Sequence, residues 1–432
     1  MLICLIEEDS QTMFARKKII FHVIAVLLFP NLMIAQGKWV NSQFDPSLDY
    51  PVLVVEAEPY LRPGMNAGTK GNFKIVYKEI GTLPARRMRL PVPQSTWRLD
   101  GRVIRTRNGI LYAGFGTYLY RSNDDGKTWI GRRIEGLPNT QQEPVSAQAF
   151  GGNHFYIYVC HQASGLPPLT SKLVTNPAVS AGRQKLYSLV ISRSSDGGEH
   201  WEGSEPLVAP HPYKALTGDG NSIVALGDGS LLVALDAYDP EVSSELPGRS
   251  AQVFFQSKDQ GLTWSKISLM QDTAAETGLV SLGGLQVLAA IRGIPNSRLG
   301  GKTIQLAESI DGGRSWFNFR SLTRVFGQAH ATLALLPGGG IVATYENRYP
   351  YAEGGDVRAR ISWDMGKSWA PEVYILMKGH GYGSSVAGND GTIITVAGDG
   401  KLGLNGQPTG RGYTLQAMRW RPWEKTKWSN NR

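Results

Sequence analysis

The stretch that decides the fold is Ser362-Trp-Asp364-Met-Gly366-Lys-Ser-Trp369. Its pattern, Ser-x-Asp-x-Gly-x-x-Trp, occurs five times in the chain. The other four copies are Ser122–Trp129, Ser194–Trp201, Ser257–Trp264 and Ser309–Trp316. Four fixed positions repeated this often exclude coincidence, so the motif marks an internal structural repeat.

The spacing of the motif indicates the size of the repeating unit. Successive first serines are 72, 63, 52 and 53 residues apart. A four-stranded propeller blade needs about 40 to 50 residues, and loop insertions lengthen it. Strand-like runs such as Gln252–Gln256 and Val357–Ile361 precede the motifs. The Asp suits hydrogen bonds to the N–H groups of its own turn, the Gly suits a positive φ, and the Trp suits packing on the blade. The motif therefore predicts a hairpin, with a structural rather than a catalytic Asp.

A second repeated element lies between the motifs, namely a Gly-containing turn that leads into an apolar run. The four examples are Asn108–Ala113, Gly227–Ala234, Pro337–Ala343 and Asn389–Thr395. We interpret these runs as buried inner strands. The strand-like Tyr413–Trp420 is placed to complete a blade begun at the N-terminus and so to close the ring. The 51 Gly and 11 Trp residues also favour short strands and tight turns over long helices.

The N-terminal region has the pattern of an export signal. Basic Arg16–Lys18 precede the apolar run Ile19–Leu28. Met33–Ala35 form an imperfect match to a signal-peptidase cleavage site. An uncleaved membrane anchor is the alternative, but Pro30 interrupts a run that is short for a membrane span. The predicted domains are a signal peptide over 1–35 and a single propeller domain over 36–432. We therefore expect a secreted or periplasmic protein that does not stay inserted in a membrane once the signal is cleaved.

Charge and cysteine content restrict the partners and cofactors. The formal net charge is +9, which favours anionic partners, although the charges are scattered and a merely basic surface is the alternative. Export disfavours nucleic acid, so an acidic glycan is the expected partner. The only cysteines are Cys4 and Cys160, so the exported chain has no cysteine pair for a disulfide or a thiolate metal site. No cofactor and no metal are predicted.

The five motifs resemble the Asp boxes (bacterial neuraminidase repeats) of the sialidase superfamily, and the resemblance covers roughly residues 95–422. It implies an all-β, six-bladed β-propeller with the Asp boxes on the rim away from the active site. The Asp box implies the fold more strongly than it implies activity, since non-enzymatic propellers also carry it.

The resemblance also implies site residues: three arginines that hold a substrate carboxylate, and a tyrosine nucleophile with a glutamate base. A guanidinium fork matches a carboxylate, and a tyrosine with a pKa of about 10 needs a base. The predicted catalytic residues are Tyr382, in Gly381–Ser385, and Glu276. The predicted substrate-binding arginines are Arg98, with Arg89 as a competing match, Arg292, and either Arg348 or Arg358.

These residues lead us to expect a secreted, sialidase-like glycoside hydrolase. One departure is that Gly109–Ser122 carries no carboxylate, where the family has a catalytic aspartic acid. One alternative is a hydrolase or lyase acting on uronic-acid polysaccharide, with His330 beside Tyr345 or Tyr382. The other alternative is a non-catalytic glycan-binding propeller. The Pro-, Ser- and Thr-rich segment 162–185 is expected to form an exposed loop near one mouth of the ring.

Overall fold

The structure of the 432-residue chain is a computed structural model. It describes residues 33–34, 39–42, 45–56, 60–61, 75–76, 78–90, 102–116, 118–138, 149–162, 189–218, 221–239, 250–271, 276–293, 303–323, 325, 327–348, 355–379, 381–398, 400 and 415–423. The predicted signal peptide, apart from 33–34, and the predicted loop after Gln162 lie outside these residues. Within the described ranges, no helix has the length and apolar character needed to cross a membrane.

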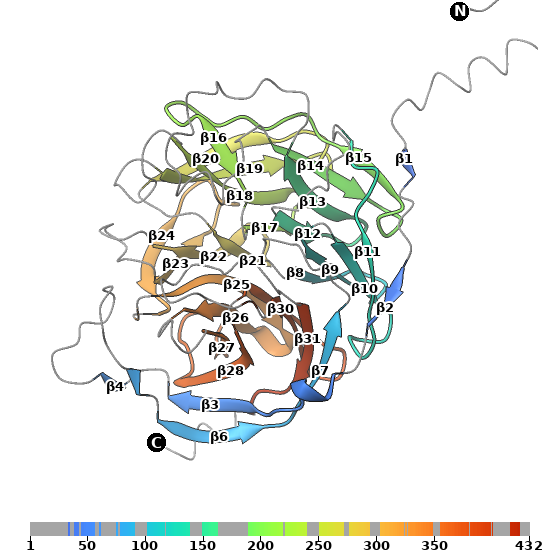
Figure 1. Cartoon of the computed structure of the whole chain (residues 1–432). Helices are drawn as coiled ribbons and strands as arrows, with labels where there is room; N and C mark the ends of the chain where they lie inside the picture. Colours follow the sequence, from blue (N-terminus) through green and yellow to red (C-terminus); the bar gives the residue numbers. More distant parts are fainter. Residues whose placement is uncertain are drawn as a thin grey trace, which may run out of the picture.

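Within the described strands we distinguish six antiparallel units of four hydrogen-bonded strands, which we call blades 1 to 6 (Figure 1). Blades 2 and 3 are joined into one sheet by their inner strands, and further strands add to several blades. Blade 1 consists of β8 (Arg102–Arg105), β9 (Leu111–Phe115), β10 (Tyr118–Ser122) and β11 (Ile130–Arg133). Blade 2 consists of β12 (Ala149–Gly152), β13 (Ile157–Gln162), β14 (Leu189–Ser194) and β15 (His200–Gly203). Blade 3 consists of β17 (Asn221–Ala225), β18 (Leu231–Tyr238), β19 (Ser250–Ser257) and β20 (Ser265–Gln271).

Blades 4 to 6 repeat this arrangement, with one strand borrowed from the N-terminal region. Blade 4 consists of β21 (Gly278–Gly283), β22 (Gln286–Arg292), β23 (Ile304–Ser309) and β24 (Phe317–Ser321). Blade 5 consists of β25 (Gln328–Leu336), β26 (Gly340–Asn347), β27 (Asp356–Ser362) and β28 (Glu372–Lys378). Blade 6 consists of β29 (Gly383–Ala387), β30 (Ile393–Gly398), β31 (Leu415–Trp420) and, from the N-terminal region, β7 (Ala85–Leu90).

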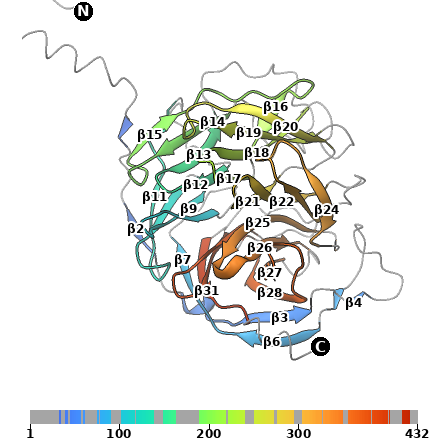
Figure 2. The same cartoon turned by 180° about the vertical axis from the view of Figure 1, so that it is seen from behind.

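The first strand of each blade lies at the centre of a closed ring. The strands β8, β12, β17, β21, β25 and β29 contact one another in that order, and β29 returns to β8. The strands of one inner pair, β12 and β17, are parallel to each other and hydrogen-bonded. Figure 2 shows the same circular arrangement from behind. The all-β propeller expected from the repeat is therefore confirmed.

The N-terminal region joins the outer edge of the ring. The strand β7 pairs with β31 along its whole length, so the last blade takes its outermost strand from the start of the domain, as predicted for Tyr413–Trp420. Further short elements add to the blade edges. These are β1 (Met33–Ile34) on β15, β2 (Val40–Asn41) on β11, β3 (Val52–Glu56) and β6 (Glu79–Leu83) beyond β28, β16 (Ala215–Thr217) on β18, and the separate hairpin β4 (Tyr60–Leu61) with β5 (Ile75–Val76). Two short 3-10 helices, Pro46–Leu48 and Pro337–Gly339, complete the described elements.

Each Asp box forms the turn between the third and fourth strands of its blade, as predicted. In the last box the Ser362 hydroxyl donates to Asp364 Oδ1 at 2.8 Å and accepts from the Gly366 N–H at 2.8 Å. The same Asp364 oxygen accepts from the Ser368 N–H at 2.8 Å. Burial opposes ionisation of Asp364, but these hydrogen bonds outweigh it and hold its pKa below the ordinary value. The Asp is therefore fixed as a structural anion within its own turn.

The boxes also connect neighbouring blades. The box glycine packs against the preceding blade and has a positive φ, which is 84° at Gly366. A Cβ at Gly366 would lie 2.7 Å from Leu288 of blade 4. At Gly198 it would lie 2.5 Å from Leu119 of blade 1. Only glycine meets both the backbone requirement and the close approach.

The runs interpreted from sequence as inner strands are instead the second strands of their blades. Gly227–Ala234 leads into β18, and Asn389–Thr395 leads into β30, which stands second in blade 6. All eight residues of β18 are buried, whereas the inner strand β21 is only partly buried. Second strands are covered by a neighbouring blade on each face, so they carry the longest apolar runs.

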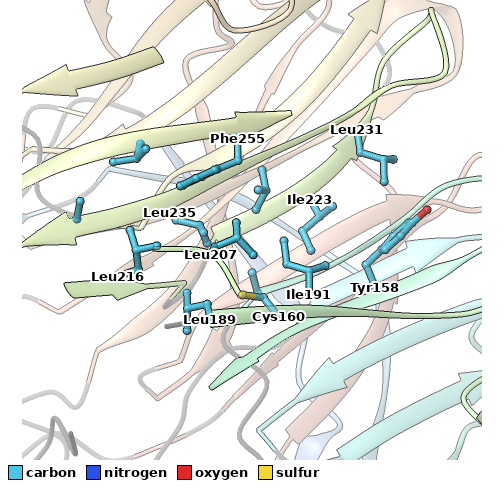
Figure 3. Close-up of a cluster of buried hydrophobic side chains, with 14 of the residues drawn as sticks. Tyr158, Cys160, Leu189, Ile191, Leu207, Leu216, Ile223, Leu231, Leu235 and Phe255 are labelled. Carbon is cyan, nitrogen blue, oxygen red and sulfur yellow. The ribbon is translucent and has the colours of Figure 1, made fainter. Parts of the chain in front are cut away.

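Apolar side chains fill the interfaces between blades. Figure 3 shows the cluster between blades 2 and 3, where Tyr158 and Cys160 of β13 meet Leu231 and Leu235 of β18 and Phe255 of β19. The Cys160 thiol is fully buried there. Comparable clusters lie at the other interfaces, so each blade is held on both faces by the hydrophobic effect.

We predict that the contact between blades 1 and 6 stabilises the ring. Asp125 is paired with Arg105, with Arg419 at 3.1 Å and with the Asn389 N–H at 3.2 Å. Asp125→Asn keeps the shape and tolerates the positive φ, but leaves two arginines short of a counter-charge. The free energy of unfolding should fall by about 2 kcal/mol in urea titrations.

The control for this prediction is Asp390→Asn, because Asp390 pairs with Arg419 at 2.9 Å and is 49% exposed. An exposed pair contributes about 0.5 kcal/mol. Equal losses in the two variants would show that Asp125 has no special part in joining blades 1 and 6.

Candidate active site

The candidate active site lies on one rim of the ring, where four inner strands begin. Arg102 opens β8, Glu276 lies two residues before β21, His330 is near the start of β25, and Tyr382 directly precedes β29. Because strands alternate in direction, the second strands end at this same rim. Asp236 of β18, Arg292 of β22 and Arg348 after β26 are found at those ends. The Asp boxes follow the third strands and therefore lie on the opposite rim.

The central contact is between Tyr382 and Glu276. The Tyr382 hydroxyl donates to Glu276 Oε1 at 2.6 Å, although 106 residues separate the two in sequence. Both side chains are largely buried, with 7% of each residue exposed. A short bond between a phenol and a carboxylate is an acid–base pair placed for proton transfer.

Two arginines complete the surroundings of this pair. Arg292 forms an ion pair with the other oxygen of Glu276, Oε2. Arg348 Nη2 donates to the Tyr382 hydroxyl at 3.1 Å, and its Nε donates to Glu346 Oε1 at 2.7 Å. The arginine side chains remain 14% and 15% exposed, respectively, so each can also reach a ligand.

His330 covers the face of the Tyr382 ring. The two ring centroids are 3.6 Å apart and the planes are tilted by 13°. His330 is the extra residue of a β-bulge in β25, between Ala329 and Ala331, and its φ is 53°. On its other side, His330 Nε2 lies 3.1 Å from Arg102 Nη2. The bulge thus turns a histidine of an inner strand under the tyrosine.

Glu276 also has an unusual backbone conformation, with φ of 68°. Its N–H donates to Asp236 Oδ1 of blade 3 at 3.0 Å, which holds this conformation. The following strand begins at Gly278, where a Cβ would overlap the carbonyl oxygen of Ala331 in β25. This close approach brings Glu276 of blade 4 next to His330 of blade 5. Non-glycine residues at positive φ are costly and concentrate at functional sites.

The electrostatics of the pair push the two pKa values apart. Burial raises the pKa of Tyr382 well above its ordinary value, and the Glu276 and Glu346 carboxylates add to the effect. Burial also opposes ionisation of Glu276, but the positive charges of Arg292 and Arg348 outweigh it and hold its pKa below the ordinary value. At neutral pH the proton therefore stays on the tyrosine and Glu276 is a carboxylate.

The structure brings together four of the predicted site residues, namely Glu276, Arg292, Arg348 and Tyr382. Of the two candidates for the third arginine, Arg348 is the one that contacts Tyr382. Arg358 instead pairs with Asp356 through two bonds, one of them 2.7 Å long. Arg98 lies outside the described residues, and Arg89 pairs with Asp45 at 2.8 Å.

The site contains three residues that sequence reasoning missed: Arg102, Asp236 and Glu346. Arg102 and Asp236 are 5% and 2% exposed, and Glu346 is fully buried. For Asp236 and Glu346 the signal is a charged residue within an otherwise largely apolar strand, as in Leu231–Tyr238 and Gly340–Asn347. In the described part of the chain, no group of three or more His, Cys, Asp or Glu residues is arranged to hold a metal ion.

Comparison with known proteins agrees with this architecture. Residues 169–395, a little over half of the chain, match the family described as "BNR repeat-like domain". The chain belongs to the BNR repeat-like domain family. Its ring is thus a BNR-repeat propeller, as the Asp boxes indicated. No curated protein sequence matches the chain.

Several solved structures share the fold of this BNR repeat-like domain. A protein of unknown function from Dyadobacter fermentans is 17% identical with a TM-score of 0.50, covering 78% of this chain and 99% of its own. The Hadza microbial sialidase Hz136 is 16% identical with a TM-score of 0.52, covering 88% and 92%. The intramolecular trans-sialidase from Ruminococcus gnavus is 14% identical with a TM-score of 0.52, covering 76% and 95%. At these identities the similarity shows the fold alone.

We predict that Glu276→Gln lowers the free energy of unfolding by about 2 to 3 kcal/mol at pH 7, because it leaves Arg292 without a buried counter-charge. The folded pKa of Glu276 is depressed, so its contribution is present above the unfolded pKa and is lost as pH falls through the folded pKa. The difference between wild type and variant should therefore shrink on acidification in urea titrations.

The matched control is Glu202→Gln, which removes an ion pair between Arg193 and a 57% exposed carboxylate. An exposed pair of this kind contributes about 0.5 kcal/mol. A Glu276→Gln variant as stable as this control at pH 7 would contradict the prediction.

Proposed function

We propose that this BNR repeat-like domain is a sialidase-like glycoside hydrolase that acts on terminal acidic sugars, with Tyr382 as nucleophile and Glu276 as its base. The observation that carries the proposal is the 2.6 Å hydrogen bond from the Tyr382 hydroxyl to Glu276 Oε1. An acidic, solvent-facing glycan also suits the +9 charge of the chain.

In the first step, the Tyr382 oxygen attacks the anomeric carbon while its proton moves to Glu276. The new bond joins the phenolic oxygen to that carbon, and the glycosidic bond to the leaving oxygen breaks. Because burial keeps the pKa of Tyr382 high, the phenolate does not form in advance. Proton transfer to Glu276 and formation of the carbon–oxygen bond therefore occur in one concerted step. The Arg348 Nη2 donor, 3.1 Å from the phenolic oxygen, stabilises the negative charge that develops there.

The leaving group departs as an oxyanion at the end of the first step. In the second step, water attacks the anomeric carbon of the glycosyl–tyrosine intermediate and loses one proton to the solvent, which balances the charge of the released oxyanion. The bond to the phenolic oxygen breaks, Glu276 returns its proton to that oxygen, and the site is restored. The Arg292 and Arg348 side chains are partly exposed, and a guanidinium matches a substrate carboxylate. In this scheme they hold the acidic sugar in place through both steps.

The leaving oxygen determines the best first substrate. The Gly109–Ser122 hairpin carries no carboxylate to serve as an acid. An aryl sialoside with an acidic phenol as leaving group needs no protonation as its glycosidic bond breaks. A 4-methylumbelliferyl sialoside therefore tests the nucleophile and base alone.

We predict that the purified mature chain releases the fluorophore and that Tyr382→Phe lowers kcat/KM at least about a thousandfold, because the nucleophilic oxygen is gone. Tyr374→Phe is the control, since Tyr374 is also buried but packs among the apolar residues around blade 5. Similar rates in wild type and Tyr382→Phe, or no release by wild type, would contradict the proposal.

Arg292 is predicted to set the acid limb of the pH profile. Burial raises the pKa of Glu276 and Arg292 lowers it, so Arg292→Gln should raise that pKa. The base is then protonated at higher pH, and the acid limb of kcat/KM moves to higher pH. Arg292→Lys keeps the positive charge but loses the planar guanidinium that binds a carboxylate through two hydrogen bonds. It should therefore raise KM while the acid limb of the kcat/KM profile stays close to its wild-type position. An unmoved limb in Arg292→Gln would exclude Arg292 as the group that lowers this pKa.

The second candidate is a hydrolase or lyase acting on uronic-acid polysaccharide, and the contact between His330 and Tyr382 is the observation that favours it. A lyase forms an unsaturated uronate that absorbs near 235 nm, which a sialidase does not. Absorbance growth with a uronate polymer, without release from the sialoside, would select this candidate. Saturable glycan binding without either reaction would select a non-catalytic binding propeller.

Export is part of the same proposal. The basic and apolar pattern of residues 16–35 supports a cleaved signal and a secreted or periplasmic location. N-terminal sequencing of the protein from the producing cell tests it. A mature chain that begins near residue 36 is expected, and an intact N-terminus would contradict it.

A further inference from the structure

His330 is buried in a position from which it contacts the proposed nucleophile rather than a substrate. Its exposed fraction is 0%, and the Tyr382 ring lies against it with centroids 3.6 Å apart. Its backbone has φ of 53° at a β-bulge, a conformation that a bulky side chain rarely adopts. The fold thus accepts local strain to place an imidazole under this ring.

The hydrogen bond to Arg102 defines the state of the imidazole. A guanidinium has donors and no acceptor, so the contact at 3.1 Å makes Nε2 of His330 the acceptor. The proton of the neutral ring is then on Nδ1. Arg102 is itself 5% exposed and opens the inner strand β8, so the histidine is held from blade 1 while it belongs to blade 5.

The phenol ring of Tyr382 is consequently fixed at its face as well as at its oxygen. Glu276 and Arg348 bind the oxygen from two directions, at 2.6 and 3.1 Å. Hydrogen bonds to the oxygen alone do not fix the plane of the ring, because rotation about the Cβ–Cγ bond leaves the oxygen in place. A flat, immobile partner against the ring removes that freedom.

We infer that His330 is a positioning residue for Tyr382: its neutral imidazole, held by Arg102, fixes the phenol ring so that the oxygen stays between Glu276 and Arg348. The inference rests on the proposed role of Tyr382 as nucleophile. His330 acts only through the tyrosine, because the ring covers it and its Nε2 is engaged by Arg102. This arrangement assigns His330 no proton transfer with the substrate, unlike the uronate alternative.

The kinetic test compares two replacements at position 330. His330→Asn removes the ring, and Asn tolerates the positive φ. We expect kcat on the aryl sialoside to fall about 30- to 100-fold with KM changed less than about threefold, because misplacing a reacting group affects the chemical step. His330→Phe keeps a flat ring and should retain kcat within about tenfold of wild type.

The matched control is His161→Gln. His161 is also fully buried, on β13 of blade 2, and contacts Ser192 Oγ at 2.7 Å. Its replacement disturbs a buried histidine without touching Tyr382, so kcat should stay within about threefold of wild type. If His330→Asn does not fold, His330→Phe decides. Wild-type-like kcat in His330→Phe supports positioning by the ring, and a folded variant with kcat reduced 30-fold or more overturns it.

A spectroscopic readout does not depend on activity. With 3-fluorotyrosine placed at position 382, ¹⁹F NMR should show one narrow resonance for wild type and for His161→Gln. The resonance should broaden or split in His330→Asn, because the ring then samples several orientations. An unchanged single resonance in His330→Asn overturns the inference, even if the sialoside is hydrolysed. Failure of the proposed function alone leaves wild type inactive, while the resonance of His330→Asn still broadens.

Discussion

A ring of sheets has no continuous chain across the gap between its last and first blades, so something else must close it. Here β7 supplies the outer strand of blade 6, pairing from Leu90 with Leu415 to Ala85 with Trp420. On the opposite rim from the site, Asp125 joins Arg105 of blade 1 to Arg419 of blade 6. Once the ring is closed, every blade is packed between two others. The start of each inner strand is then fixed relative to all the rest.

This fixed rim explains how several charged groups are tolerated in a largely buried place. Burying an isolated ion is costly, but an ion with a partner of opposite charge and good geometry is retained. The rim pairs Arg292 with Glu276 and Arg348 with Glu346. The positive φ values of Glu276 and His330 add strain that the surrounding strands must offset. Rigid blades supply the stability that a flexible loop does not have.

Sequence predicts those features of the fold that depend on contacts between residues close together in the chain. The Asp box forms its turn from hydrogen bonds within seven residues, as between Ser362, Asp364 and Ser368, so its pattern predicts its structure. The residues Glu276 and Tyr382 were found only through the family resemblance, since no local pattern links residues 106 positions apart. The sequence does not distinguish inner strands from second strands correctly, because the second strands are the more apolar of the two.

Arg102, Asp236 and Glu346 escaped prediction for a related reason. Each acts through a contact with another blade or with a neighbouring site residue, and Arg102 lies 228 positions from His330. For Asp236 and Glu346 the sequence signal is one charged residue in a largely apolar strand, which does not show what that residue contacts. His330 differs, because a histidine next to an apolar run is a candidate site residue from sequence alone. Only the bulge in β25 shows that its side chain lies against the Tyr382 ring.

The opposite pKa shifts of Tyr382 and Glu276 have a consequence for how a buried phenol acts as a nucleophile. A preformed phenolate beside a carboxylate would place two negative charges 2.6 Å apart in a site with little water. The raised pKa of Tyr382 prevents this, and the lowered pKa of Glu276 keeps the base free to accept. In the mechanism we propose, negative charge on the phenolic oxygen then develops only as its proton moves to Glu276 and the bond to carbon forms, with Arg348 already in place. The proposed pair would therefore react only with a bound electrophile.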